Sequence, residues 1–239
     1  MKIRSTALSA ALLSTVVLAV PASAQVAGIA TADTSVAIAR SKALSLAYQQ
    51  ISTTYGSSAQ LIQTKRKEIN DINVQLDTNK DKELTQIELD AAIKAKNPLL
   101  TQLDAKQKEI NQLQDPIIKA QLFAVESIAM KYEAAQQAVI TAKKISVILS
   151  PDAFVWAPDS VDVTPLITAE IDKAVPSVGI TAPADWRPSR QGAALYQQIQ
   201  QLFEGAARAQ AAQAQTGQPP QPGQPVPAPT NPVPQPDSR

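Results

Sequence analysis

The residues from Asp77 to Glu88 are the part of this sequence whose types and spacing best suit a chemical task. Oxygen-bearing side chains stand at positions one, three, five and twelve of a twelve-residue segment, and these are Asp77, Asn79, Asp81 and Glu88. An apolar residue, Leu84, occupies position eight. This is the ligand spacing of an EF-hand calcium loop, whose last carboxylate binds the ion through both oxygens. Calcium binding is therefore one hypothesis for this segment.

The sixth position of the same segment opposes calcium binding. Glycine normally stands there because the chain turns sharply with a positive φ, whereas this sequence has Lys82. Its β-carbon would be strained and its charge would lie beside the ion. We therefore favour a polar hairpin tip over 77–98, in which Asp77 caps the next helix, predicted from Thr85 to Lys96 and ended by Pro98. No residue is predicted to be a metal ligand on this interpretation.

The composition excludes most other chemistry. The chain has no Cys and no His, so it lacks Cys nucleophiles, Ser-His-Asp triads, His-ligated zinc and disulfides. It has 22 basic and 21 acidic residues, so no overall field attracts nucleic acid, and its seven Gly form no phosphate-binding loop. We predict no catalytic residue, no cofactor and no nucleic-acid partner. The function must then come from the architecture.

Two segments with heptad spacing dominate the middle of the chain. The first, 41–76, contains no Pro, and its apolar stripe comprises Ile62, Ile69, Ile72 and Leu76. The second, 99–142, places Leu103, Ile110 and Ile117 at one heptad position and Leu99, Lys106, Leu113 and Ala120 at the other. These segments predict the two helical arms of an antiparallel coiled-coil hairpin around the tip 77–98. Within the second arm, Lys106 should weaken the packing and Pro116 should kink the helix.

Short strand-like segments flank the arms. We predict strands over 26–32, 144–149 and 153–157, the last with Trp156 packed inside, and a closing helix over 164–175. A strand at the start that pairs with strands from the end would hold the feet of the hairpin together. The predicted fold class is mainly α with a small β platform (α+β).

The N-terminus has the features of an export signal. Lys2 and Arg4 precede an apolar run from Ala7 to Val20, and small residues end at Ala24. We predict a signal peptide over 1–24, cleaved after Ala24, and a soluble mature protein outside the cytoplasm.

The C-terminal part has two sections. An extension over 177–216 contains a predicted helix at 189–215, whose apolar residues are Leu195, Ile199, Leu202 and Phe203, and Trp186 is expected to dock it. The last section, 217–239, carries 9 of the 18 Pro residues. It is predicted to be a disordered, solubilising tail, and a spacer or a ligand for a proline-binding domain is the alternative.

The block KISVILSPDAFVWAPDSVDVTPLITAEIDKAV, from Lys144 to Val175, follows a signal peptide, a short strand and a long helical hairpin. This arrangement, over about 26–175, resembles the Skp/OmpH family of periplasmic chaperones. The resemblance implies a homotrimer whose strands form one body and whose helical tentacles surround a cavity that holds unfolded outer-membrane proteins. It implies no catalytic residue and leaves open a peripheral contact with the membrane or lipopolysaccharide. The chain departs from the family in its near-neutral charge and its Pro-rich tail.

The predicted function is that of a periplasmic, ATP-independent holdase. Client contacts are expected at apolar residues outside the heptad stripe, such as Leu61, Val74, Leu122 and Val125, although none of these is assigned as a site. The alternatives are a structural coiled-coil protein of the envelope and a calcium-responsive variant that uses loop 77–88.

Overall fold

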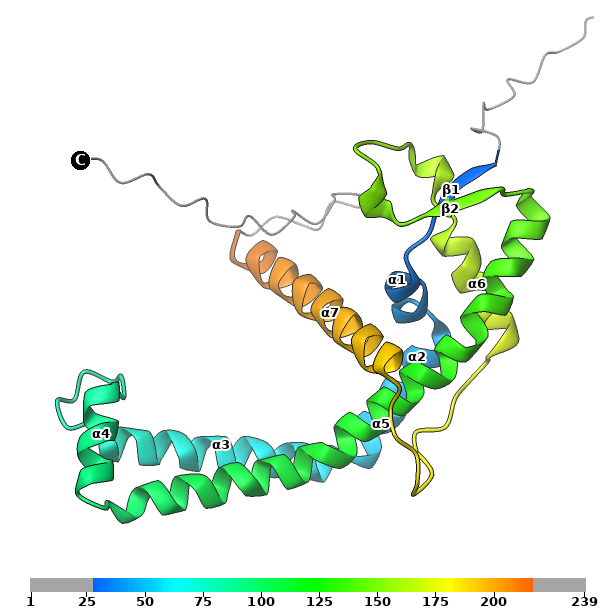
Figure 1. The fold of residues 1–239 in the computed structure, drawn as a ribbon. Coiled ribbons are helices and arrows are strands. Elements are labelled where there is room, and N and C mark those ends of the chain that lie inside the picture. Colours follow the sequence, from blue (N-terminus) through cyan, green and yellow to red (C-terminus); the bar gives the residue numbers. More distant parts are fainter. Residues whose placement is uncertain (1–27, 217–239) are drawn as a thin grey trace, which may run out of the picture.

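A computed structural model describes residues 28–216 of the chain. A long helical hairpin extends from a small body, and a further helix stands in the angle between them (Figure 1). The predicted signal peptide with its cleavage after Ala24, the start of the first predicted strand and the Pro-rich tail 217–239 lie outside the described residues.

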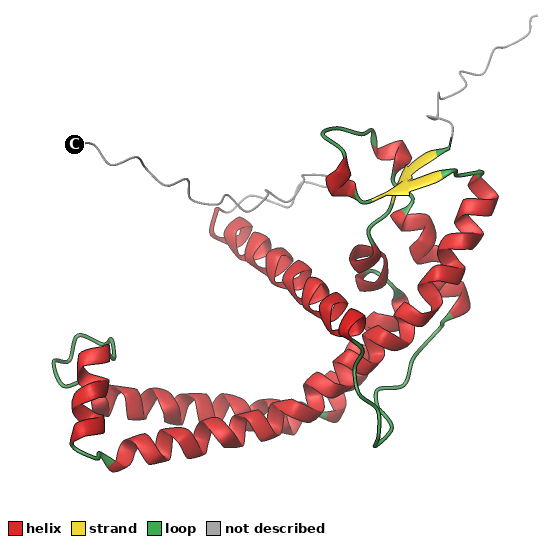
Figure 2. Ribbon diagram, viewed as in Figure 1, coloured by secondary structure: helices red, strands yellow, loops and turns green. Residues whose placement is uncertain are grey.

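Two short strands join the beginning of the described chain to the end of the hairpin. Strand β1 (Ile29–Thr31) pairs in parallel with β2 (Val147–Leu149). Before β1, Gly28 has a φ of +89°, and its carbonyl accepts hydrogen bonds from the N–H groups of Ser146 (2.7 Å) and Val147 (2.8 Å). The predicted pairing between a first strand and one that follows the arms is confirmed, and Figure 2 shows how small this sheet is beside the helices.

The strand predicted over 153–157 is wrong. Pro151–Ala153 forms a short 3-10 helix, η1, and no regular element follows until η2 (Asp159–Val161). Pro151 begins one 3-10 turn and Pro158 precedes the next, so the stretch between them is too short to continue a strand ladder. Trp156 is 80% exposed rather than packed in the platform. In place of the predicted third strand, Asp162 forms an isolated parallel bridge with Thr31 of β1.

The outgoing arm predicted over 41–76 consists of two helices rather than one, and a further short helix precedes it. Helix α1 (Thr34–Ala39) is capped by Asp33, and α2 (Lys42–Thr54) is capped by Ser41. Helix α3 (Gly56–Leu76) follows after a break at Tyr55, whose φ of −107° and ψ of 17° leave the helical region. The sequence prediction of a continuous arm over 41–76 missed this break.

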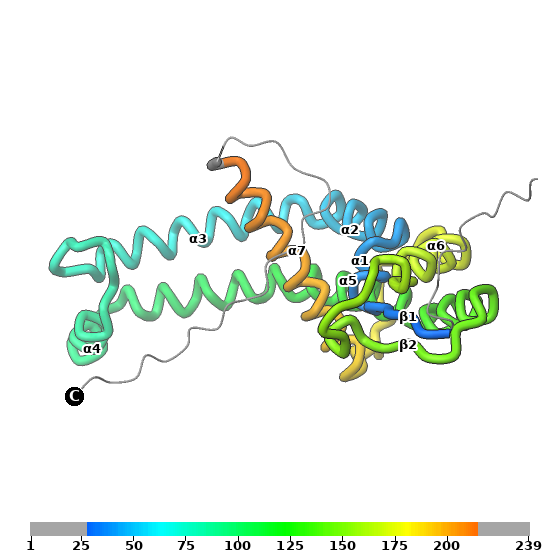
Figure 3. The backbone as a smooth tube through the Cα atoms, turned by 90° about the horizontal axis from the view of Figure 1, so that it is seen from above, coloured from blue at the N-terminus to red at the C-terminus, as the bar shows by residue number. Residues whose placement is uncertain are grey.

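The return arm is one helix of 46 residues, α5 (Pro98–Lys143), capped by Asn97. It passes through the exposed Pro116 without ending and bends over its middle part (Figure 1). Helices α3 and α5 run side by side in both orthogonal views (Figures 1 and 3). Their facing side chains are buried at the predicted stripe positions Ile62, Ile72, Leu76, Ile110 and Ala120.

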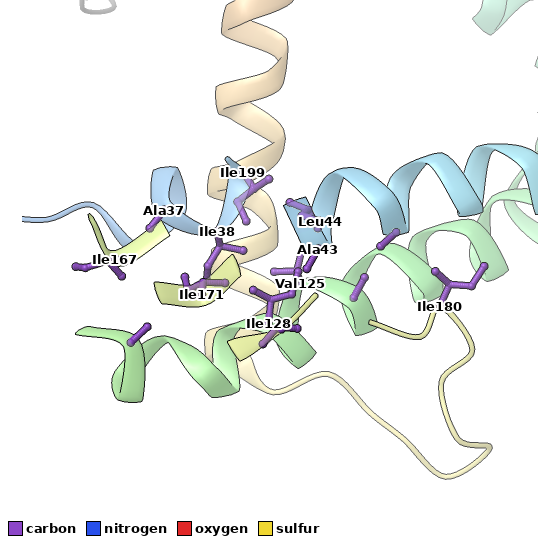
Figure 4. Close-up of a cluster of buried hydrophobic side chains, with 14 of the residues drawn as sticks. Ala37, Ile38, Ala43, Leu44, Val125, Ile128, Ile167, Ile171, Ile180 and Ile199 are labelled. Carbon is purple, nitrogen blue, oxygen red and sulfur yellow. The ribbon is translucent and has the colours of Figure 1, made fainter. Parts of the chain in front are cut away.

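The main core lies in the body, around the second half of α5. Helices α6 (Thr164–Ala174) and α7 (Arg190–Thr216) complete it together with α1 and α2. Figure 4 shows side chains from all these elements directed at one another, and among those without exposed surface are Ile38, Ile128, Ile167, Ile171 and Ile199. A second, smaller cluster of Ile72, Leu76 and Ala92 lies at the far end, where α4 (Gln86–Lys94) packs on the arms.

Candidate functional site

Of the candidate calcium ligands, Asp77, Asn79 and Asp81 lie between α3 and α4, and Glu88 lies in the first turn of α4, at the tip of the hairpin. Asp77 ends α3, and its two carboxylate oxygens accept hydrogen bonds from the N–H groups of Lys80 (2.7 Å) and Lys82 (2.8 Å). Asp81 accepts one from the N–H of Glu83 at 2.9 Å and another from the amide of Asn79 at 2.8 Å. The loop thus uses its own N–H groups to satisfy its carboxylates.

Glu88 is buried and joins both ends of this loop. One carboxylate oxygen accepts hydrogen bonds from the N–H groups of Thr78 (2.7 Å) and Asn79 (3.1 Å). The other accepts from the N–H of Thr85 at 3.1 Å, and the Thr85 hydroxyl accepts in turn from the N–H of Glu88 at 3.4 Å. This reciprocal pair is a capping box at the start of α4. The prediction that Asp77 caps this helix is therefore wrong, because Thr85 does so.

The hydrogen bonds to Glu88 also lower the pKa of its carboxyl group. The N–H of Thr85 contributes most, followed by those from Asn79 and the Thr78 hydroxyl, and together they lower the pKa of Glu88 to about 2. Each donor favours the charged form of the carboxylate. Glu88 is therefore an anion at any pH the protein is expected to meet.

The positive φ expected at Lys82 is present, and it extends to a neighbour. Lys82 has a φ of 73° and Lys80 a φ of 62°, a region that costs side chains other than Gly conformational energy. Within 28–216, no group of three or more acidic side chains is placed to hold a metal ion. Internal hydrogen bonds to Asp77, Asp81 and Glu88 hold the loop in this geometry.

The outer surfaces of the arms carry isolated apolar side chains. Among the residues expected to contact clients, Leu61 is 50% exposed and Val74 is 60% exposed. Leu122 is half-buried, and Val125 is fully buried in the main core, so its assignment as a surface residue is wrong. The body begins further along α5 toward the tip than the heptad pattern indicates.

Charged side chains also link the arms. Lys106, predicted to weaken the packing, reaches Glu68 of α3 at 2.5 Å, and Lys65 reaches Glu109 of α5 at 2.7 Å. The Lys65 ammonium group also lies 3.5 Å from Glu68. These contacts form one chain of alternating charge across the two helices, so the polar residue in the stripe has a partner.

The body has an uncovered apolar surface at its sheet. Val147 is 45% exposed, and Ile29, Leu149 and Leu166 are also exposed. Beside them runs a groove of about 360 Å³ lined in part by Ile145 and Val161. In the described part of the chain, no strand pairs with the outer edge of β2. An open strand edge beside apolar side chains is a surface suited to association.

The family model of outer membrane proteins of the OmpH-like type matches residues 28–171, more than half of the 239 residues. The chain belongs to this OmpH-like family. The resemblance inferred from the sequence over about 26–175 is thereby confirmed. The match includes the sheet, both arms and most of α6, whereas α7 lies beyond it.

A solved structure assigned provisionally as an OmpH-like outer membrane chaperone, from Caulobacter crescentus CB15, is similar to this OmpH-like protein. The two share 20% sequence identity with a TM-score of 0.41, over 69% of this chain and 92% of the other. No curated protein matches the sequence. Within 28–216, no helix is both long enough and apolar enough to cross a membrane.

Sequence reasoning missed the contribution of α7 to the core. The helix itself was predicted over 189–215, and Trp186 docks its approach by packing edge-on against Phe123 with ring centroids 5.3 Å apart, as expected. Its partner surface was not predicted. The available signal was the spacing of Leu195, Ile199 and Phe203, which marks one apolar helix face but not the helices that it meets.

Proposed function

We propose that this OmpH-like protein is a periplasmic, ATP-independent holdase that keeps unfolded outer-membrane proteins from aggregating. The observation that carries the proposal is the family match across the sheet and both arms. The structure agrees with such a role, because the arms project from the body and carry exposed apolar side chains on a largely polar surface. Many weak contacts of this kind hold an unfolded chain without a shaped pocket.

The holdase is proposed to act as a homotrimer built on the sheet. The outer edge of β2 and the exposed side chains of Ile29 and Val147 would be covered by neighbouring copies. Two strands alone form a marginal sheet, and a continued ladder between copies would supply the missing hydrogen bonds. Trp156 is exposed on the loop after β2 and would be covered by a neighbouring copy in the same way.

An aggregation assay tests the holding function. An outer-membrane β-barrel protein is diluted from denaturant into buffer with or without the mature chain, and light scattering is recorded. We expect scattering to be suppressed to the same extent with ATP, with ADP and without nucleotide. Unchanged scattering at a severalfold molar excess of the mature chain would contradict the proposal.

Sedimentation equilibrium tests the assembly. The mature chain is expected to have the mass of three copies at micromolar concentration. Val147→Asp would place a charge in the covered edge and should shift the population toward single chains while helix content is retained. The matched control is Val74→Asp, an exposed residue on the arm that should leave the mass unchanged.

A further inference from the structure

The segment from Val175 to Phe203, here called the strap, wraps around α5 and lies beyond the family match. Val175 and Ile180 are buried in the main core on one side of α5, and Ile199 is fully buried on the side of α7. Between them the chain passes beneath α5 before α7 rises above it (Figure 1). The strap therefore contacts the long helix from more than one side.

Polar contacts fix the strap to both arms at their base. The Tyr196 hydroxyl donates to the side-chain carbonyl of Gln121 on α5 at 2.7 Å. Gln200 donates to the hydroxyl of Tyr48 on α2 at 2.9 Å, and the Tyr48 ring packs edge-on against Phe203 at 5.8 Å. The strap thus bridges α2 and α5, the two helices that leave the body together.

Both arms are irregular just beyond these contacts. The outgoing arm breaks at Tyr55, and the return arm contains Pro116, which has no N–H to donate to the preceding turn. Tyr55 and Ile117 pack against the same core cluster, so the two irregularities lie near the same level of the hairpin. A groove of about 250 Å³ opens there between the arms, and Gln121, the partner of Tyr196, is among its lining residues. We call this level the joint.

We propose that the strap sets the direction in which the arms leave the body by holding α2 and α5 together on the body side of the joint. Without the strap, this direction would depend only on the outgoing arm and α5, and both are irregular at the joint. The strap adds contacts to α2 and α5 on the body side of it. The inference concerns a single chain and requires neither assembly nor client binding. The role of the strap can therefore be wrong while the proposed holdase function is right, and the holdase function can be wrong while the role of the strap is right.

Two glycines of α7 offer a matched pair of variants. A β-carbon at Gly192 would lie 3.0 Å from the carboxyl carbon of Glu126 and 3.1 Å from the Ser189 hydroxyl, whereas one at Gly205 would meet no atom within 4 Å. The Glu126 carboxylate also accepts the N–H of Ser189 at 3.2 Å, at the approach to α7. Gln at either position raises helix propensity. At Gly192, however, which is buried, the Gln side chain would have to displace the Glu126 carboxylate, and we expect it to loosen the packing of α7 on α5.

The experiment measures the distance between the tip and the body by electron spin resonance. Because the chain has no Cys, spin labels can be placed at Lys94→Cys and Lys173→Cys of the mature chain, both exposed and outside the strap. Labelled chains are diluted into unlabelled ones to suppress distances between copies. We expect one narrow distribution for the parent and for Gly205→Gln, and one at least ~2-fold broader for Gly192→Gln.

Fluorescence of Trp186 in a Trp156→Phe background reports whether the strap has left Phe123. If the strap has left α5 in Gly192→Gln but the distance distribution stays narrow, the inference is overturned. Equal broadening of the distances in both glycine variants would also overturn it.

If the strap stays docked in Gly192→Gln, the same distance is measured in a chain that ends at Ser177 and so lacks most of the strap. Provided that the other helices are retained, a broad distance distribution in this chain supports the inference and a narrow one overturns it.

Discussion

The two ends of the hairpin are held by different interactions. At the body, α1, α2, α5, α6 and α7 bury apolar side chains against one another, and hydrogen bonds join residues far apart in sequence. The N–H of Lys42 donates to the Asp172 carboxylate at 2.8 Å across 130 positions. At the tip, the carboxylates of Asp77 and Glu88 accept bonds from residues no more than ten positions away.

The body is expected to unfold cooperatively, whereas the tip is expected to open locally. Apolar packing among five helices should fail only when the body unfolds as a unit. The tip, with its small cluster and internal hydrogen bonds, can open without disturbing the body. The proposed holdase would benefit from this difference, because its base would stay assembled while its arms adapted to clients.

The largest effect is expected from removing apolar volume at the body. Ile128→Ala, at a fully buried position, should lower the free energy of unfolding by about 2–5 kcal/mol. Ile72→Ala in the tip cluster should cost less, about 1–2 kcal/mol, because the small cluster can collapse around the gap. Urea unfolding at one fixed protein concentration measures both. Equal losses would contradict the division into two regions.

A smaller effect is expected from acid, and at the tip it depends on Glu88. The pKa of Glu88 is about 2, below its ordinary value of 4.5, so its contribution to stability is complete above pH 4.5 and is lost as the pH falls toward 2. NMR signals of the Thr78 and Asn79 amides should shift in this range, while those around the buried Ile199, which has Gln residues on both sides, should not. Glu88→Gln should abolish the shift. A midpoint near 4.5 would show that the hydrogen bonds to Glu88 do not form.

Calcium is expected to have almost no effect. The carboxylates of loop 77–88 are already engaged by N–H groups, and Lys82 places a cation there. Millimolar calcium should therefore leave the melting temperature of the mature chain unchanged. Calorimetry that gave a Kd below about 1 mM, lost on Glu88→Ala but retained in Gln86→Ala, would establish the calcium-responsive alternative.

The smallest effect is expected from deleting 217–239. This segment has no apolar periodicity, and its Pro residues cannot form a ladder. Melting temperature and sedimentation should match those of the full mature chain. A fall of several degrees would show that the segment packs against the body.

Features set by local spacing were predictable from the sequence. The stripe residues Ile62 and Ile110 located the arms, and Pro98 marked the boundary between the tip helix and the return helix. The six-residue α1 is too short to show periodicity, and the break at Tyr55 occurs without a proline. The burial of Val125 and Ile199 depends on which helices meet in space, which periodicity in a single segment does not specify.

Native mass spectrometry of a mixture with an unfolded outer-membrane β-barrel protein shows whether the trimer holds a client. We expect a complex of three copies of the mature chain with one client, formed without nucleotide. Val147→Asp should lose this complex together with the trimer, whereas Val74→Asp should keep the trimer. A client bound to a single copy, or a trimer that binds no unfolded client, would contradict the proposed function.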